Sequence, residues 1–174
     1  MKKDSLPTGY SLSGEDILRE LDGKCNLIQY KNIDKYKTIE DLLGKYKKCV
    51  ILYNTTENYG HWTCLYEHNG TIYFFDSYGI IPDDELKWRR CYGADCYHSV
   101  RYLTKLLYND KRPVQYNEYP LQERRAGIST CGRHVINRLK YPEISVDDYY
   151  KIFKDASRYM NIDKLICLLV PINN

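Results

Sequence analysis

The sequence predicts the α+β class, with a small mixed central sheet flanked by helices. Two aromatic-rich, β-prone segments are joined through Asn69-Gly70, which supplies the two positive-φ residues of a tight hairpin turn. The run over residues 49–53 is apolar throughout, which is typical of a strand covered on both faces. Helical segments precede and follow these strands. No repeat or Pro/Gly-rich linker interrupts the chain, so residues 1–174 are predicted to form one domain.

The helices are predicted mainly from their capping residues. Ser13 is the expected N-cap of the first helix, with Asp16 at its third position, and Ser145 stands three residues before Asp148 in the same way. Periodicity does not decide between a strand and a helical turn for the apolar stretch 165–172. The other predicted elements are, in order, helices over 14–21 and 38–46, strands over 49–53, 62–67 and 71–75, a helix over 99–108, a strand over 114–117, and helices over 131–140 and from 145 to near 160.

Composition places the chain among globular proteins, with 43% hydrophobic and 28% charged residues. The longest apolar run, 165–172, is far too short to cross a bilayer, and no apolar stretch follows the charged N-terminal residues. Neither a membrane protein nor a secreted one is therefore expected. Seven cysteines without a repeating spacing then predict free thiols in a reducing compartment.

The hairpin turn fixes a register that brings a histidine and an aspartate together. If Asn69-Gly70 forms the turn, His68 pairs with Thr71, and Thr63 faces Asp76 further along the strands. Side chains alternate across a strand, so His61 lies on the same face as Thr63 and is a diagonal neighbour of Asp76. An aspartate bonded to one ring nitrogen fixes the tautomer that a catalytic base requires. An ordinary polar pair at a strand end is the alternative.

Cys131 is predicted to open a helix, with Ser129 or Thr130 as its cap. Unpaired N–H groups at a helix start favour the nucleophilic thiolate and can also stabilise an oxyanion. Cys131, Val135 and Leu139 recur at helical spacing, so the thiol is expected on the face that packs against the sheet. Gly132 is expected to let a substrate backbone approach closely. Gln122 is the candidate side-chain donor for the oxyanion.

These residues, taken in order, resemble the adenain-like and ubiquitin-like-protein-specific cysteine proteases. The resemblance is carried by His61-Trp62, Phe75-Asp76-Ser77, Pro120-Leu121-Gln122 and Thr130-Cys131-Gly132, and it covers about residues 50 to 140. It implies a triad of His61, Asp76 and Cys131, with Gln122 in the oxyanion hole. The gap between Gln122 and Cys131 is longer than the family's usual one, which leaves Gln115 as a distant rival. Trp62 would line a narrow cleft that favours small residues such as Gly.

In size and in the segment around Cys131, the chain looks most like proteases of DNA viruses, virophages and Polinton-type elements that process capsid precursors. The resemblance therefore implies a monomeric cysteine endopeptidase that acts on a protein substrate, such as a capsid precursor, without a metal or organic cofactor. Its place would be the virion, or the host-cell cytoplasm or virus factory.

Three alternatives remain open. The same chemistry would serve to remove a ubiquitin-like modifier of the SUMO type. A nucleic-acid or structural binding module would instead use the basic run Lys87-Trp88-Arg89-Arg90, although such runs are usually solvated. In an enzyme, the same run motivates the hypothesis that DNA stimulates the reaction. Zinc binding by Cys91, Cys96 and His98 would lack a fourth ligand. His134, on the same predicted helix as Cys131, has no evident carboxylate partner.

Overall fold

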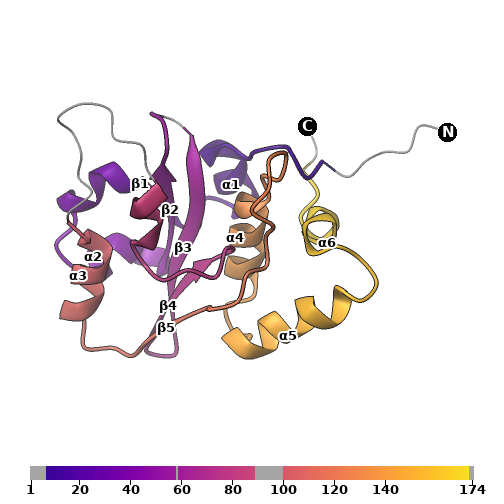
Figure 1. Ribbon diagram of the computed structural model, residues 1–174. Coiled ribbons are helices and arrows are strands. Elements are labelled where there is room, and N and C mark those ends of the chain that lie inside the picture. The colour runs from indigo at the N-terminus through magenta and orange to yellow at the C-terminus, as the bar shows by residue number, and fades with distance from the viewer. Residues whose placement is uncertain (1–6, 58, 89–99, 173–174) are drawn as a thin grey trace.

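A computed structural model describes residues 7–57, 59–88 and 100–172 of the chain as a sheet with helices on both sides (Figure 1). The predicted α+β class is confirmed. The elements are, in order, α1 (Gly14–Glu20), β1 (Asn26–Gln29), η1 (Tyr30–Lys35), α2 (Ile39–Leu43), η2 (Gly44–Tyr46), β2 (Lys48–Asn54), β3 (Gly60–His68), β4 (Thr71–Asp76), η3 (Asp84–Trp88), α3 (Tyr102–Asn109), β5 (Val114–Tyr116), α4 (Cys131–Lys140), α5 (Val146–Ala156) and α6 (Ile162–Leu169).

The five strands lie in the sheet in chain order, from β1 to β5. The two edge strands run parallel to their neighbours, whereas β2, β3 and β4 are antiparallel, so the sheet is mixed as predicted. The β3–β4 register matches the prediction, because His68 pairs with Thr71 and Thr63 pairs with Asp76. Asn69 and Gly70 have φ angles of 49° and 76°, which gives the tight turn its positive-φ pair.

Each face of the sheet has its own hydrophobic core. On one face α4, flanked by α1, α5 and α6, covers alternate strand residues such as Val50, Cys64 and Phe75. On the other face η1, α2 and α3 cover the intervening residues, including Ile51, Leu65 and Phe74. Figure 1 shows α4 between the sheet and the C-terminal helices. Both faces are therefore buried, as the unbroken apolar run in β2 predicted.

Local capping explains where most helices begin. Ser13 and Asp16 form a reciprocal capping box at α1, and Ser145 accepts a hydrogen bond from the Asp148 N–H at the start of α5. The predicted helix over 38–46 is α-helical only over α2 and continues as the short 3₁₀ helix η2 from Gly44, whose φ is positive at 61°.

Several predicted boundaries were wrong. α5 ends at Ala156 instead of near residue 160. The C-terminal stretch, for which strand and helix were both left open, is helical up to Leu169 as part of α6, and Asn161 is the N-cap of that helix. α3 begins at Tyr102 rather than at residue 99, which lies outside the described residues. Neither β1 nor η1 was predicted, since the four residues of β1 show no clear alternation.

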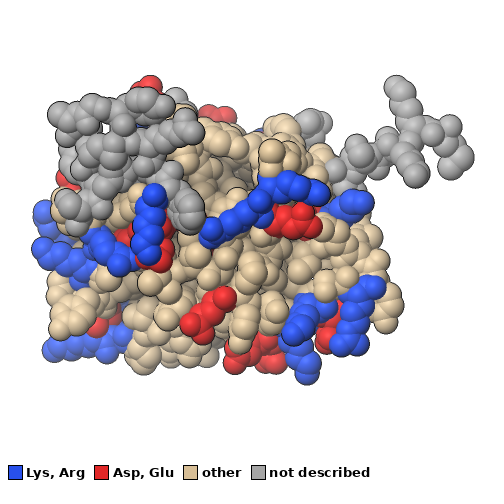
Figure 2. Space-filling view, in the orientation of Figure 1, with Lys and Arg blue, Asp and Glu red and all other residues tan. Residues whose placement is uncertain are grey.

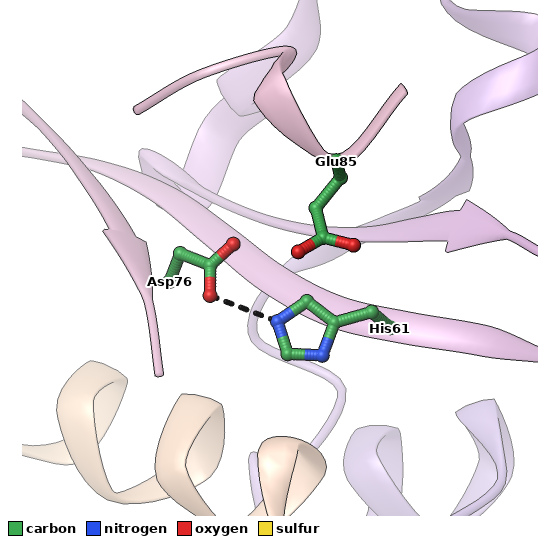
Figure 3. Close-up of side chains that lie close together, drawn as sticks. All are labelled: His61, Asp76 and Glu85. Atoms are coloured by element: carbon green, nitrogen blue, oxygen red, sulfur yellow. Dashed lines mark hydrogen bonds and ion pairs between the residues drawn. The ribbon is translucent and has the colours of Figure 1, made fainter. Parts of the chain in front are cut away.

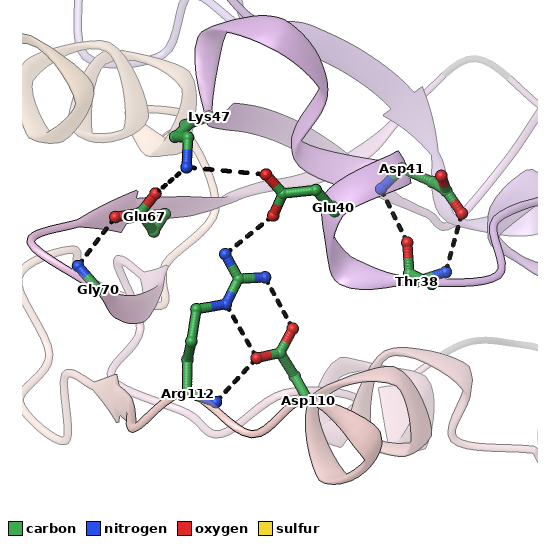
Figure 4. Close-up of polar contacts among 8 residues, drawn as sticks. All are labelled: Thr38, Glu40, Asp41, Lys47, Glu67, Gly70, Asp110 and Arg112. Atoms are coloured by element: carbon green, nitrogen blue, oxygen red, sulfur yellow. Dashed lines mark hydrogen bonds and ion pairs between the residues drawn. The ribbon is translucent and has the colours of Figure 1, made fainter.

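The turn of the β3–β4 hairpin is tied to neighbouring elements by surface ion pairs (Figure 4). Glu67 accepts the Gly70 N–H and pairs with Lys47. Arg112 then joins Glu40 of α2 to Asp110 after α3. Lys47 also pairs with Glu40 and so links the hairpin turn to α2, although exposed pairs of this kind stabilise little individually.

The described residues also show the state of the cysteines and the length of the apolar helices. Cys25, Cys49, Cys64, Cys131 and Cys167, the cysteines among the described residues, are all free and buried. None of the helices in the described part of the chain is long and apolar enough to cross a membrane.

Candidate active site

His61 and Asp76 meet at one end of the sheet, where β3 begins and β4 ends. Nε2 of His61 donates to Oδ1 of Asp76 over 2.9 Å, which confirms the predicted diagonal contact (Figure 3). The side chain of Asp76 is fully buried, and its Oδ1 also accepts the Tyr78 N–H at 2.7 Å. The Tyr78 ring stacks on the imidazole with ring centroids 4.3 Å apart. Asp76 therefore fixes one ring nitrogen of His61 and leaves Nδ1 for another partner.

The environment of His61 favours the protonated imidazole. Burial by itself would lower the pKa of His61, but the charge and hydrogen bond of Asp76, with a smaller contribution from a hydrogen bond to Cys131, raise that pKa well above its ordinary value. The Cys131 side chain lines the same cavity as the imidazole that Asp76 orients. Sequence reasoning joined Cys131 to the His61–Asp76 pair only through a family resemblance, and in the structure Cys131 and His61 line one cavity.

Cys131 is the first residue of α4, as predicted, but the cap is different. Thr130 occupies the N-cap position without capping the helix through its side chain. Its hydroxyl donates instead to Oδ1 of Asp163 in α6. The expected side-chain cap by Ser129 or Thr130 is therefore wrong, and no side-chain cap covers the N–H groups of the first turn of α4 among the described residues.

The expected role of Gly132 was also wrong. The space in which its side chain would lie is filled by Leu12, since an added Cβ would stand 3.1 Å from the Leu12 Cβ. Gly132 thus allows the N-terminal segment to pack closely on α4. The helical face predicted for Cys131 is confirmed, because Val135 and Leu139 are fully buried against the sheet.

The structure brings Gln122, and not Gln115, to this site. The hydroxyl of Ser77 donates to Oε1 of Gln122 over 2.7 Å, and the Gln122 Nε2 lies 3.4 Å from the Tyr78 hydroxyl. The N–H groups of Leu121 and Gln122 both donate to the Ser77 carbonyl. Gln115 lies exposed on the edge strand β5. The amide oxygen of Gln122 is therefore held by Ser77, which leaves the N–H₂ group as the donor end, close to the Tyr78 hydroxyl.

One cavity of about 190 Å³ joins these groups. Its wall includes the side chains considered above and one further acidic residue: His61, Tyr78, Glu85, Gln122 and Cys131. A larger hollow, lined by Trp62, Leu12 and Gly14, continues from it, and Ser11, Tyr59 and Gly60 border both. Trp62 is buried and donates its indole N–H to the Leu12 carbonyl at 3.0 Å. Trp62 thus forms a fixed wall beside the cavity.

Two acidic residues at the site were missed by sequence reasoning. Glu85 of η3 lies beside the His61–Asp76 pair (Figure 3). Asp163 of α6 accepts hydrogen bonds from the Thr130 hydroxyl and from the Glu123 N–H, and so joins the segments that carry Cys131 and Gln122. Asp163 lies more than thirty residues after Cys131, whereas Glu85 follows Asp76 by only nine residues, and no spacing rule connected either residue to the site.

His134 is fully buried in α4, and neither of its ring nitrogens has a hydrogen-bond partner in the described part of the molecule. Burial, helped by the charge of His61, lowers the pKa of His134 to about 3. His134 is therefore a neutral core residue, in contrast to His61.

The remaining candidates fall largely outside the described residues. Cys91, Cys96 and His98 do so entirely, and of the basic run only the Lys87 side chain is described, as an ion pair with Asp84. On the face shown in Figure 2, basic and acidic side chains stand in small mixed groups.

The fold and the site together define an α+β domain with a Cys–His–Asp arrangement at one end of its mixed sheet. No family model matches the chain. The chain belongs to the same family as "Uncharacterized protein V9" of Sputnik virophage, to which it is 36% identical over 163 residues, covering 91% of this chain and 93% of V9.

Solved structures show more distant likenesses. The SUMO protease Ulp1 with its catalytic cysteine oxidised to a sulfinic acid is 17% identical with a TM-score of 0.44, covering 94% of this chain and 80% of that one. The central domain of the uncharacterized Lpg1148 protein from Legionella pneumophila is 15% identical with a TM-score of 0.41, covering 91% and 93%.

Proposed function

We propose that the protein is a cysteine endopeptidase with Cys131 as nucleophile, His61 as base and Asp76 as the residue that orients the base. One observation carries this proposal: a single buried imidazole is hydrogen-bonded to Asp76 through Nε2 and lines the same cavity as the Cys131 side chain. A nucleophile, a base within hydrogen-bond reach and a third group that orients the base are the parts that covalent acyl transfer requires.

The reaction follows from where the proton lies. His61 takes the proton of the Cys131 thiol as the sulfur becomes a nucleophile, because Asp76 favours the protonated imidazole by raising the pKa of His61. The sulfur attacks the carbonyl carbon of the scissile peptide, and His61 then gives its proton to the departing amine, which leaves a thioester on Cys131. Water, deprotonated by His61, attacks the thioester and releases the carboxylic acid, which restores the thiol and the base.

The oxyanion formed in each attack needs donors that are already in place. Gln122 Nε2 is such a donor, because Ser77 fixes the oxygen end of the same amide. The first-turn N–H groups of α4 supply further donors next to the nucleophile. The Cys131 backbone N–H and Gln122 therefore form the proposed oxyanion hole.

For the substrate, we infer a virion precursor protein that is cleaved after a small residue such as Gly. The relative V9 comes from a virophage, which favours a viral protein as substrate. Trp62 and Leu12 are held together by a hydrogen bond and form a fixed wall of the hollow beside the cavity, where the substrate residues before the scissile bond are proposed to lie. No cofactor takes part in this chemistry.

Thiol labelling tests the proposed nucleophile and base directly. We expect iodoacetamide near neutral pH to alkylate Cys131 faster than the other buried cysteines. His61→Ala should slow this labelling by roughly 10²–10⁴-fold, the usual contribution of a positioned base. Peptide mass mapping measures the site and rate, and Cys64→Ala is the matched control for a buried thiol outside the cavity. Equal labelling of several cysteines in both proteins would contradict the proposal.

A second experiment separates the possible substrates. The purified protein is incubated with virion precursor proteins of its own virus and, separately, with SUMO conjugates, and Cys131→Ala is the control in both reactions. Cleavage of the precursors alone supports the proposal, whereas cleavage of the conjugates alone would replace it by deconjugation. Adding DNA at low salt tests the proposed stimulation through the basic run, and an unchanged rate would remove that part.

A further inference from the structure

Glu85 extends from η3 to the His61–Asp76 pair, and the mechanism above leaves it without a task. One oxygen of Glu85, one oxygen of Asp76 and one nitrogen of His61 all lie within 4.8 Å of one another (Figure 3). Glu85 is only 8% exposed and lines the same cavity as Cys131 and Gln122. Charged groups are rarely buried without a partner, so this carboxyl requires an explanation.

The neighbouring Asp76 has one satisfied oxygen and one that is not. Oδ1 accepts hydrogen bonds from His61 Nε2 and from the Tyr78 N–H, whereas the buried Oδ2 has no partner in the described part of the chain. Leaving a buried acceptor of this kind unpaired is unfavourable. In Figure 3 this second oxygen points toward the Glu85 carboxyl. An ionised Glu85 would place a second negative charge there, but a protonated one supplies the missing donor.

We propose that Glu85 carries a proton and donates it in a hydrogen bond to Oδ2 of Asp76, directly or through one water. Glu85 is then a positioning residue, and this inference rests on the proposed function. With both oxygens of Asp76 engaged, the carboxylate cannot rotate, so Oδ1 stays on Nε2 of His61 and Nδ1 stays directed at Cys131. Only hydrogen-bond donation is involved, and no bond to carbon or sulfur changes.

The groups that face Glu85 from the surrounding elements are consistent with this proton. Burial raises the pKa of Glu85 most, the charge of His61 lowers it, Asp76 raises it and Arg124 lowers it, with a net rise. Tyr78 and Cys131 complete the wall of the cavity. A cation held by the same three residues would have to break the 2.9 Å bond between His61 and Asp76, whereas a proton on Glu85 leaves that bond in place.

The test compares three variants. Glu85→Ala removes the donor and should slow Cys131 alkylation by about tenfold or more, the cost of losing a hydrogen bond to a charged group. Glu85→Gln keeps an N–H donor at the same position and should stay within about twofold of the wild-type rate. Asp84→Ala is the matched control, because Asp84 lies in the same short helix but pairs with Lys87 and Arg101 outside the cavity.

NMR titration of the His61 ring gives a readout that does not depend on proteolysis or on labelling. We expect the pKa of His61 to fall in Glu85→Ala and to hold in Glu85→Gln, with circular dichroism showing that each variant is folded. Equal losses in the Ala and Gln variants would overturn the inference, because charge and not donation would then matter. Unchanged titration in both would overturn it as well. Absence of selective Cys131 labelling in the wild type would instead count against the proposed function, while the His61 titration still decides the role of Glu85.

Discussion

The end of the β3–β4 hairpin and the middle of α4 each bury a histidine, yet the two side chains behave oppositely. His61 contacts Asp76, and its pKa is raised well above the ordinary value despite burial. His134 has no hydrogen-bond partner in the described part of the chain, and burial lowers its pKa to about 3. A buried histidine is thus neutral by default, and a single well-placed carboxylate makes it a charged group.

The pH dependence of stability should differ in sign for the two histidines. His61, with a raised pKa in the folded state, stabilises the fold below its unfolded pKa, and this stabilisation is lost as pH rises through the folded pKa. His134, with a lowered pKa, binds a proton in the unfolded state first. Its contribution therefore favours unfolding increasingly as pH falls from about 6.5 toward 3.

Asp76→Asn tests the comparison most directly, because without the carboxylate the pKa of His61 should be lowered by burial, as the pKa of His134 is. The amide keeps the shape of Asp76 but not its charge, so burial becomes the largest influence on the pKa of His61, which should drop below its ordinary value. Cys131 labelling near neutral pH should slow by roughly 10²–10⁴-fold. NMR titration of the ring and alkylation kinetics measure the two effects.

Asp83→Asn is the matched control for that substitution. Asp83 is also a buried carboxylate, but it accepts hydrogen bonds from Tyr53 and from the Thr104 N–H instead of from a histidine. Its replacement should lower the free energy of unfolding and leave the His61 titration in place. A His61 pKa that stays high in Asp76→Asn would show that another group charges the ring.

His134→Leu tests the other histidine, because it removes the buried side chain whose pKa is lowered in the folded state. Each pH unit below 6.5 costs the wild type about 1.4 kcal/mol through His134 until pH approaches 3. Between neutral pH and about pH 4.5 the variant should therefore gain roughly 2–3 kcal/mol relative to the wild type. Urea denaturation at both pH values measures this gain, with His68→Gln as the comparison variant. Parallel losses in wild type and His134→Leu would mean that His134 is solvated or paired.

Sequence reasoning was most accurate where local geometry leaves no freedom. The Asn69-Gly70 turn sets the register, and alternation then places His61 beside Asp76, so this half of the site followed from the residues alone. The half that holds Cys131 and Gln122 depends on contacts between distant segments. The Asp76 N–H donates a hydrogen bond to the side chain of Asn117, and the Ser77 hydroxyl donates one to Gln122. Each of these bonds joins residues more than forty positions apart in the sequence. No periodic pattern marks such contacts.

The errors have the same origin. Thr130 looked like a helix cap because its neighbours in sequence allowed it, but its hydroxyl bonds to Asp163 of a helix over thirty residues later. Gly132 looked like a place for substrate until Leu12, from the N-terminal segment, was found to occupy the space. Local rules predict what a residue can do, and tertiary contacts select which of these possibilities the fold uses.

Ser77→Ala extends the comparison to Gln122, whose amide also depends on one fixed partner. Gln122→Ala sets the limit, since loss of an oxyanion donor costs roughly 10²–10³-fold in turnover. Without the Ser77 hydroxyl the amide loses about 1 kcal/mol of orienting hydrogen bond, so Ser77→Ala should slow peptide hydrolysis by about fivefold while Cys131 labelling stays unchanged. The double variant should be no slower than Gln122→Ala, because both changes act on the same amide. If the two losses instead multiply, Ser77 contributes separately from Gln122, and the amide is oriented by other contacts.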